Sequence, residues 1–285
     1  MVRRLNTFSG RHRTVDHTAL YDKSIGSSES FAVEVIRGMA CGRTLIGWGL
    51  AWVSAVVMAG PPYQTDDPEP VELHHGEFYI ASQQALTADG RSGSLPHLEF
   101  NYGALPNLQL HLLVPYAFNT PEDGPSQRGR GDTELGVKYR FVQESDDTPM
   151  VGIFPLYLAP TGDQGRGLGN GASQFYLPIW LQKSWGPWTS YGGGGYWINH
   201  AQGARNSLFL GWQVQRDLSE RWTLGAEVFH RTEQVVGQGS ISGFNVGGQF
   251  NIDEHDHLLF SLGRGLQNAQ ATDRVSSYLG YQLTF

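Results

Sequence analysis

A two-residue alternation of apolar and polar side chains constrains this chain most, and its last twelve residues, 274–285, show it clearly. Leu279, Tyr281, Leu283 and Phe285 share one face of an extended strand, whereas the residues between them are small or polar. Side chains alternate between the two faces of a strand, so one face of this segment is apolar. Such a face suits the lipid-facing wall of an outer-membrane β-barrel if it turns outward, and a soluble sandwich if it turns inward.

The alternation recurs in twelve segments of similar length. They are residues 76–88, 95–104, 107–118, 132–143, 150–160, 172–184, 188–199, 206–217, 222–232, 241–252, 257–266 and 274–285. Each is close to the ~9–11 residues that a tilted strand needs to cross a membrane. In the fourth segment Leu135, Val137 and Tyr139 share one face, and Lys138 and Arg140 lie on the other.

The connections between these segments alternate in length. Short ones are residues 105–107, 144–149, 186–187, 219–220 and 253–256, and longer ones are 89–94, 119–131, 161–171, 200–205, 233–240 and 267–273. Short turns on one rim and long loops on the other are typical of an outer-membrane meander with both termini on the periplasmic side. We therefore predict an all-β fold, a closed antiparallel up-and-down transmembrane β-barrel of about 12 strands, over residues 76–285. A secreted β-sandwich stays an alternative, because periodicity does not say which face is wet.

The front of the chain predicts export. Residues 39–59 combine Arg43, an apolar core over 45–58 and small residues before a cleavage site, which is the pattern of a cleaved signal peptide. Residues 1–38 are polar and aperiodic, and we interpret them as an over-extended or disordered N-terminus; a long natural n-region is the alternative. Residues 60–75, rich in proline and acids, are predicted to be a periplasmic leader.

Composition excludes some classes of partner. Cys41 is the only cysteine and lies within the predicted signal peptide, so no disulfide is expected after cleavage. Of the 20 Lys+Arg and 27 Asp+Glu residues, 13 and 23 follow residue 60, a balance of −10 (13 − 23). This charge argues against a nucleic-acid partner. The 37 glycines and 12% aromatic residues fit a β protein with many turns.

The polar face of the strands carries the candidate functional residues. The predicted lumen-lining residues are Glu99, Gln109, Glu134, Lys138, Arg140, Gln213, Glu227, Arg231 and Gln249. Rings of charged side chains are one means by which pores select solutes. They predict an outer-membrane channel or transporter for small-molecule solutes, with no cofactor. The alternative is a narrow structural barrel whose interior is filled by these groups as salt bridges.

Catalytic and metal sites have weaker support. A membrane-embedded hydrolase would need Ser, His and Asn or Asp together at a rim; His111 and His230 are available, but no nucleophile motif accompanies them. We therefore predict no catalytic residue and no enzyme activity. The histidines of residues 74–75 and 253–257 fall at one rim, but without the ligand spacing of a fixed metal site, so no metal is predicted.

The end of the chain predicts how the barrel is assembled. Tyr281, Leu283 and Phe285 form a candidate C-terminal assembly signal, which implies membrane lipid and the outer-membrane barrel assembly machinery as partners. Trp185 and Trp188 lie beside a predicted short turn, as expected of an aromatic girdle at the membrane interface.

Several motifs also carry a family resemblance. They are residues 61–68 (PPYQTDDP), 131–141 (GDTELGVKYRF), 160–163 (PTGD) and 192–197 (GGGGYW). With them the chain, over 61–285, resembles the bacterial family named for the MetA pathway of phenol degradation. That resemblance implies an outer-membrane transporter, and the family's name implies phenolic or hydrophobic cargo. It assigns no functional residue.

Overall fold

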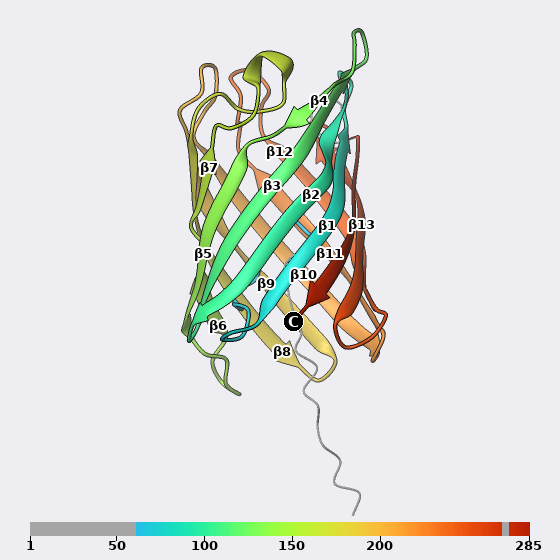
Figure 1. Ribbon diagram of the computed structural model, residues 1–285. Helices are drawn as coiled ribbons and strands as arrows, with labels where there is room; N and C mark the ends of the chain where they lie inside the picture. The colour runs from blue at the N-terminus through green and yellow to red at the C-terminus, as the bar shows by residue number, and fades with distance from the viewer. Residues whose placement is uncertain (1–60, 270–273) are drawn as a thin grey trace, which may run out of the picture. The chain divides into compact units, whose positions relative to one another are not determined.

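The computed structural model describes residues 61–269 and 274–285, so the predicted N-terminus (1–38) and signal peptide (39–59) lie outside the described residues. The described part is almost entirely β-structure (Figure 1). No helix in these residues is long and apolar enough to span a membrane.

The sheet consists of fourteen strand segments. They are β1 (Gly76–Leu86), β2 (Gly90–Leu105), β3 (Leu108–Pro121), β4 (Gln127–Arg130), β5 (Thr133–Val142), β6 (Met150–Ile153), β7 (Leu156–Ala159), β8 (Gln174–Trp185), β9 (Trp188–Asn199), β10 (Ser207–Ser219), β11 (Trp222–Arg231), β12 (Ile241–Asn251), β13 (Asp256–Gln267) and β14 (Val275–Thr284). A 3-10 turn, η1 (Gln164–Arg166), interrupts the β7–β8 connection.

Two of the wall strands are broken, which reduces the fourteen segments to twelve strands around the barrel. β4 and β5 both pair with β3, and β6 and β7 both pair with β5 and β8. The second break contains Pro155, which has no N–H to donate to the ladder. The predicted count of twelve strands is confirmed.

The barrel closes between its first and last strands. β1 pairs antiparallel with β14 from Glu77↔Thr284 to Leu86↔Val275, and Figure 1 shows the cyan β1 beside the dark red β14. All other neighbouring strands are antiparallel as well. Closure lets the backbone N–H and C=O groups of the two edge strands form hydrogen bonds. Each such group would cost several kcal/mol if it were unpaired in lipid.

Exposure of the side chains shows which face turns outward. On β5, Leu135 and Val137 are 47% and 37% exposed, whereas Lys138, which follows Val137 and points to the opposite face, is 4% exposed. On β10, Trp212 is exposed and Gln213 is fully buried. A water-soluble sandwich has the opposite arrangement, with its apolar face inside. The wall of this barrel therefore presents apolar side chains to its surroundings, as lipid requires.

The loops differ from the expected pattern at one corner. The first outer connection, predicted over residues 89–94, is only residues 87–89, because β2 begins at Gly90. The connection predicted over 119–131 contains the ends of a β3–β4 hairpin, so that only residues 122–126 and Gly131 lie outside the strands. Gly90 and Gly93 indicate a turn in the sequence, but both have positive φ within a paired strand. Strands β2 and β3 consequently extend beyond the other strands at the long-loop end (Figure 1).

Aromatic side chains gather at the short-turn end. Trp185, Trp188 and Trp222 are all exposed, and the Trp222 ring lies 4.6 Å from the Phe250 ring, centroid to centroid. Exposed amphipathic rings at this level fit a membrane interface, where part of each ring is wet.

A substitution of Val137 tests whether the apolar face of the strands turns toward lipid. Val137→Arg should destabilise the folded barrel by about 2–4 kcal/mol, because it places a charge near the middle of the apolar band. The matched control is Leu218→Arg near the short-turn rim, where the same charge should cost only ~0–1 kcal/mol. Urea unfolding of the refolded barrel in vesicles measures both. Equal costs at the two positions would contradict the assignment of this face to lipid.

Candidate functional site

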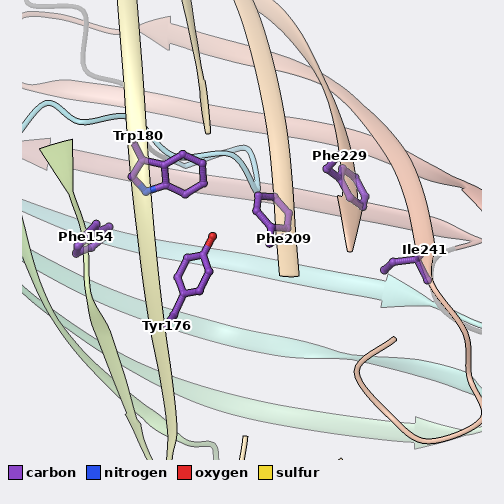
Figure 2. Packing of buried hydrophobic residues seen from close by; sticks show 6 residues of the cluster. All are labelled: Phe154, Tyr176, Trp180, Phe209, Phe229 and Ile241. Carbon is purple, nitrogen blue, oxygen red and sulfur yellow. The ribbon is translucent and has the colours of Figure 1, made fainter. Parts of the chain in front are cut away.

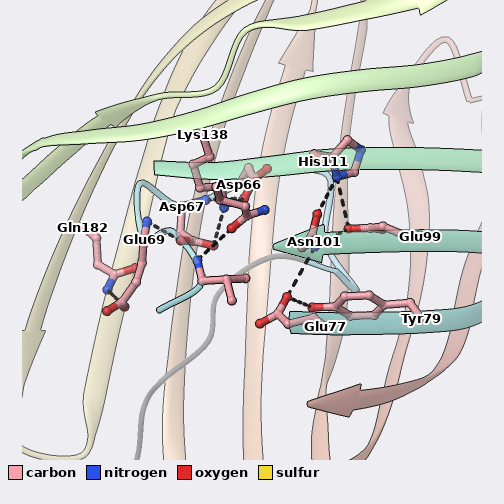
Figure 3. Close-up of polar contacts among 12 residues, drawn as sticks. Asp66, Asp67, Glu69, Glu77, Tyr79, Glu99, Asn101, His111, Lys138 and Gln182 are labelled. Carbon is pink, nitrogen blue, oxygen red and sulfur yellow. Dashed lines mark hydrogen bonds and ion pairs between the residues drawn. The ribbon is translucent and has the colours of Figure 1, made fainter. Parts of the chain in front are cut away.

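The interior of the barrel contains a segment of the chain's own N-terminal end. We call residues 61–72 the crossing segment; Thr65 is 1% exposed and Asp67 is 0% exposed. Sequence analysis predicted residues 60–75 as a periplasmic leader. Residue 60 is outside the described residues. The structure places the segment from residue 61 to Val71 inside the barrel, where lumen side chains bind it (Figure 3), whereas the side chain of Glu72 is exposed.

Glu227 on β11 forms the first anchor of the crossing segment. Its carboxylate accepts hydrogen bonds from the backbone N–H of Gln64 and of Thr65, both at 2.8 Å, and from Thr65 Oγ1 at 2.6 Å. Asn245 Nδ2 donates to the same carboxylate at 2.5 Å. Charge-assisted hydrogen bonds of this kind are among the strongest in proteins. One buried side chain thus fixes two consecutive residues of the segment.

Lys138 on β5 forms the second anchor. Its Nζ donates to Asp66 Oδ1 at 3.0 Å and to Asp67 Oδ2 at 3.5 Å. Beside it, Arg140 lies 3.7 Å from the Glu69 carboxylate, and Gln182 Nε2 donates to the same carboxylate at 3.2 Å. The acidic residues of the segment therefore meet the cations of the barrel wall (Figure 3).

Gln109 on β3 forms the third anchor, since its Oε1 accepts from the backbone N–H of Val71 at 2.9 Å. In the closed ring, five strands separate β3 from β11 in either direction. The segment binds Gln109 on β3 and Glu227 on β11. It therefore crosses the lumen from one side to the opposite side.

Three glycines of the wall make room for the crossing segment. A Cβ at Gly211 would lie 2.2 Å from Thr65 Oγ1, and one at Gly103 would lie 1.9 Å from the Glu72 carbonyl oxygen. At Gly152 the Cβ would meet Pro68 at 3.0 Å. Such close approach is a common reason for glycine within a strand. The wall and the segment are shaped to fit each other.

Burial affects the ionisation of the segment's carboxyls. It raises the pKa of Asp67 above its usual range, although Lys138 acts in the opposite direction. Burial also raises the pKa of Glu69, against the hydrogen bond from Gln182 and the charge of Arg140. The docked segment therefore binds these protons more tightly than a segment in water would, so a fall in pH favours docking through these two groups.

A buried polar cluster occupies the wall formed by β1, β2, β3 and β5. Asn101 Nδ2 donates to Glu99 at 2.9 Å, and its Oδ1 lies 2.7 Å from His111 Nδ1. His111 Nε2 lies 3.1 Å from Glu134 Oε1, and Glu77 accepts a hydrogen bond from the Tyr79 hydroxyl at 2.7 Å. Buried polar groups need such partners to be stable.

Another part of the lumen wall is aromatic. We call the buried side chains of Phe154, Tyr176, Trp180, Phe209 and Phe229, together with Ile241, the aromatic wall (Figure 2). Trp197 stacks on Tyr176 with 4.4 Å between ring centroids, and Trp180 meets Phe209 edge to face at 6.3 Å. The aromatic wall runs from the break between β6 and β7 round to β12. At its first end the Phe154 ring meets the His111 ring of the polar cluster edge to face at 5.3 Å. Most side chains of the aromatic wall lie near the strand ends that join the long loops.

The predicted lumen-lining residues take different places inside the barrel. Glu99, Gln109, Lys138, Gln213 and Glu227 are buried, and Glu134, Arg140, Arg231 and Gln249 are partly buried. Gln109, Lys138, Arg140, Glu227 and Arg231 contact the crossing segment, the last through Gln64 Oε1 at 2.9 Å. Glu99 and Glu134 join His111, whereas Gln213 and Gln249 bond to Gln215 and Asn251.

Sequence analysis missed both the crossing segment and the aromatic wall. The segment has no periodicity, and its partners lie between 38 residues away, as for Val71 with Gln109, and 199 residues away, as for Pro62 with Ser261. The aromatic wall did leave a signal. Phe209 has the same strand parity as Gln213, and Tyr176 and Trp180 share their parity with Gln182.

One serine and one histidine lie together without forming a catalytic relay. Ser94 Oγ is 3.1 Å from His97 Nδ1, but His97 Nε2 is 3.8 Å from the Glu99 carboxylate. The distance from His97 Nε2 to Glu99 is too long for a hydrogen bond. Ser94 and His97 are also buried, so we interpret the two side chains as an extension of the buried polar cluster.

The rim histidines have no ligand cluster around them. Within residues 61–269 and 274–285, no three His, Cys, Asp or Glu side chains are placed to hold a metal ion. Asp253 accepts from the backbone N–H of His255 at 2.9 Å and of Asp256 at 3.0 Å, which is turn geometry.

Comparison with solved structures places the fold among outer-membrane barrels. The crystal structure of the COG4313 outer membrane channel from Pseudomonas putida F1 aligns with a TM-score of 0.63 at 16% identity, over 77% of this chain and 98% of that chain. The KdgM porin aligns at 0.52 and 10%, over 73% and 99%. The NanC porin aligns at 0.51 and 7%, over 73% and 98%. At these identities the similarity shows the fold.

No family model and no curated protein matches the sequence. The resemblance to the phenol-degradation family therefore stays a prediction.

Proposed function

We propose that this protein is an outer-membrane channel that passes small aromatic or hydrophobic molecules passively through its lumen. The export signal predicted over residues 39–59 and the apolar exterior of the barrel support this location. Solved barrels of the same fold are described as a channel and as porins, which supports passive passage for this chain. The substrate class rests on the interior itself.

The aromatic wall is the observation that carries the proposal. A lumen for sugars or ions needs hydrated polar walls, whereas buried aromatic rings offer apolar surface and π-faces to a solute. Here six apolar side chains from five strand regions form one continuous cluster inside the barrel. The polar cluster around Asn101 and His111 borders this wall, because the His111 ring lies 5.3 Å from the Phe154 ring, and it can bind a hydroxyl or other polar group of the same solute.

Passage requires the crossing segment to move, because it binds opposite walls. It is held by ion pairs and hydrogen bonds to side chains, as at Lys138 and Glu227. Water can replace each of these contacts in turn, so the net free energy that holds the segment is much smaller than the sum of its bonds. We infer that the segment restricts the lumen and is displaced when a solute passes.

Phe209 tests the selectivity that we propose. Phe209→Ala should lower the uptake of L-phenylalanine relative to L-serine by roughly 2- to 10-fold, since one aromatic pair contributes ~0.5–1.5 kcal/mol. Both solutes are zwitterions, so they cross the lipid itself slowly. Liposome swelling with the reconstituted protein gives the two rates.

The matched control is Phe175→Ala, which removes an exposed ring from the outer face of β8. It should leave the ratio of the two rates unchanged. A ratio that is the same for Phe209→Ala, Phe175→Ala and the wild type would argue against a selective aromatic wall. If no protein preparation passed either solute, the barrel would have a structural role.

A further inference from the structure

Three arginines stand together on the outer face of the barrel, at the end with the long loops. Arg128 on β4 pairs in register with Phe118, and Arg130 pairs with Tyr116. Arg91 on β2 pairs with Thr120. Residues 116, 118 and 120 share one face of β3, and exposed Tyr116 shows that this face turns outward. We call Arg91, Arg128 and Arg130 the arginine patch.

In the described part of the chain, ion pairs with carboxylates neutralise several cations of the barrel, but none of the three arginines of the patch. Lys138, Arg140, Lys183 and Arg205 each form an ion pair with a carboxylate. Among the described residues, none of the three patch arginines does. Arg91 lies over the Phe118 ring at 5.3 Å, and Arg130 donates to Thr133 Oγ1 at 3.0 Å. These contacts orient the guanidinium groups without neutralising them.

Among the described residues, three acids lie near the patch, but none of them forms an ion pair with any of the three patch arginines. Asp89, Glu122 and Asp123 belong to the connections at the tip of the β1–β4 region, beyond the paired strands. The chain after residue 60 has a formal balance of −10, and the three arginines lie on β2 and β4, the two strands that flank β3. β2 and β4 are two strand spacings apart, about 10 Å. Arginine side chains are long, so a ligand with two phosphate groups can contact guanidinium groups on both strands.

An apolar groove begins beside the patch and runs along the outer wall. It has a volume of about 440 Å³ and is lined by Pro96, Leu98, Val114, Pro115, Tyr116 and Arg130. It lies where the β2–β3 register shifts between Ser94 and His97, so two consecutive residues bulge from the ladder there. Arg130 belongs to both the groove and the patch. The positive charge of the patch and the apolar groove are therefore adjacent on the outer wall.

We propose that the arginine patch binds the phosphate groups of a lipid headgroup in the outer leaflet, with one acyl chain of that lipid in the groove. The proposal goes beyond passage through the lumen, but it rests on the outer-membrane location. Arginine binds phosphate oxygens bidentately, and its weak hydration suits an interface. Basic residues at headgroup level attract anionic lipids in the same way. The groove supplies the apolar contact that a free phosphate cannot use.

The test measures binding of diphosphoryl lipid A to the full-length protein, expressed and exported normally, purified from outer membranes and stripped of lipid in mild detergent. Native mass spectrometry counts the retained lipid. The double variant R128Q/R130Q should bind it roughly 10- to 30-fold more weakly, because two basic contacts are lost. The matched control is Arg216→Gln, because Arg216 lies over the Trp188 ring at 5.2 Å at the opposite rim. It should bind lipid A as the wild type does.

Two further measurements separate the headgroup from the chain. Dephosphorylated lipid A should bind the wild type as weakly as diphosphoryl lipid A binds the double variant. Val114→Trp, which fills the groove, should weaken lipid A binding while inorganic phosphate at high concentration still competes. Equal binding of lipid A to the wild type, the double variant and Arg216→Gln would overturn the proposal. Equal binding of the phosphorylated and dephosphorylated lipids would also overturn it. Solute uptake in liposomes is independent of these readouts, so failure here leaves the channel proposal standing.

Discussion

Deleting residues 61–72 should raise the single-channel conductance of the barrel severalfold and should lessen its discrimination between solutes. The segment is bound at Glu227, Lys138 and Gln109, which lie on different sides of the lumen, so its removal clears the cross-section. The wall itself is a closed ladder from β1 to β14 and does not need the segment for its hydrogen bonds. Planar bilayer recording of the purified variant measures the change.

A point variant should give the same effect more weakly. Glu227→Ala leaves the backbone N–H groups of Gln64 and Thr65 without their acceptor, at a cost of ~1–3 kcal/mol for each buried donor. The matched control is Gln249→Ala, since Gln249 donates to Asn251 at 2.7 Å and has no bond to the segment. Wild-type conductance in the deletion variant would show that the segment does not restrict passage.

Replacing Phe285 by Asp should prevent assembly of the barrel in the membrane. The backbone of Phe285 closes the ring, because its N–H donates to the Gly76 carbonyl at 3.0 Å and its carbonyl accepts from the Gly76 N–H at 2.7 Å. Its exposed ring lies across Gly76 and 6.4 Å from the Phe100 ring. A carboxylate there is charged at the apolar interface. We also propose that this end of the chain is what the barrel assembly machinery binds.

Heat-modifiable migration of outer-membrane fractions reports on assembly. Phe285→Asp should give little or no compact form, whereas the conservative control Phe285→Tyr should assemble like the wild type. Normal amounts of the compact form in Phe285→Asp would count against a role of this residue in closure.

Strand parity explains why the wall could be predicted from sequence. The period of two is a local property, and on β5 it separates Val137 from Lys138 without knowledge of any other strand. The ends of strands were harder to predict from the sequence where glycine occurs near them. Gly90 and Gly93 normally mark turns, but here they allow a twisted strand to continue, with the Gly93 Cα facing the Gln83 carbonyl.

The interior could be predicted only in part, because its contacts join residues far apart in the chain. The lumen charges of Lys138 and Arg140 suggested rings around an open pore, whereas they neutralise acids of the crossing segment. Complementary charges 72 residues apart leave no periodic signal. The aromatic wall was local enough to predict, because Phe209 and Trp180 share their strand parity with Gln213 and Gln182, but the glutamines alone were taken to define the inward face.

A reversible covalent lock on the crossing segment tests passage through the lumen most directly. Thr65→Cys with Gly211→Cys places two thiols at the point where Thr65 Oγ1 and a Cβ at residue 211 would be 2.2 Å apart. Cys41, the only native cysteine, precedes the predicted cleavage site. We expect liposomes with the oxidised variant to take up no L-phenylalanine, and reduction to restore the wild-type rate. Wild-type uptake by the oxidised variant, or no uptake by the reduced variant and the wild type, would contradict passage past a displaceable segment.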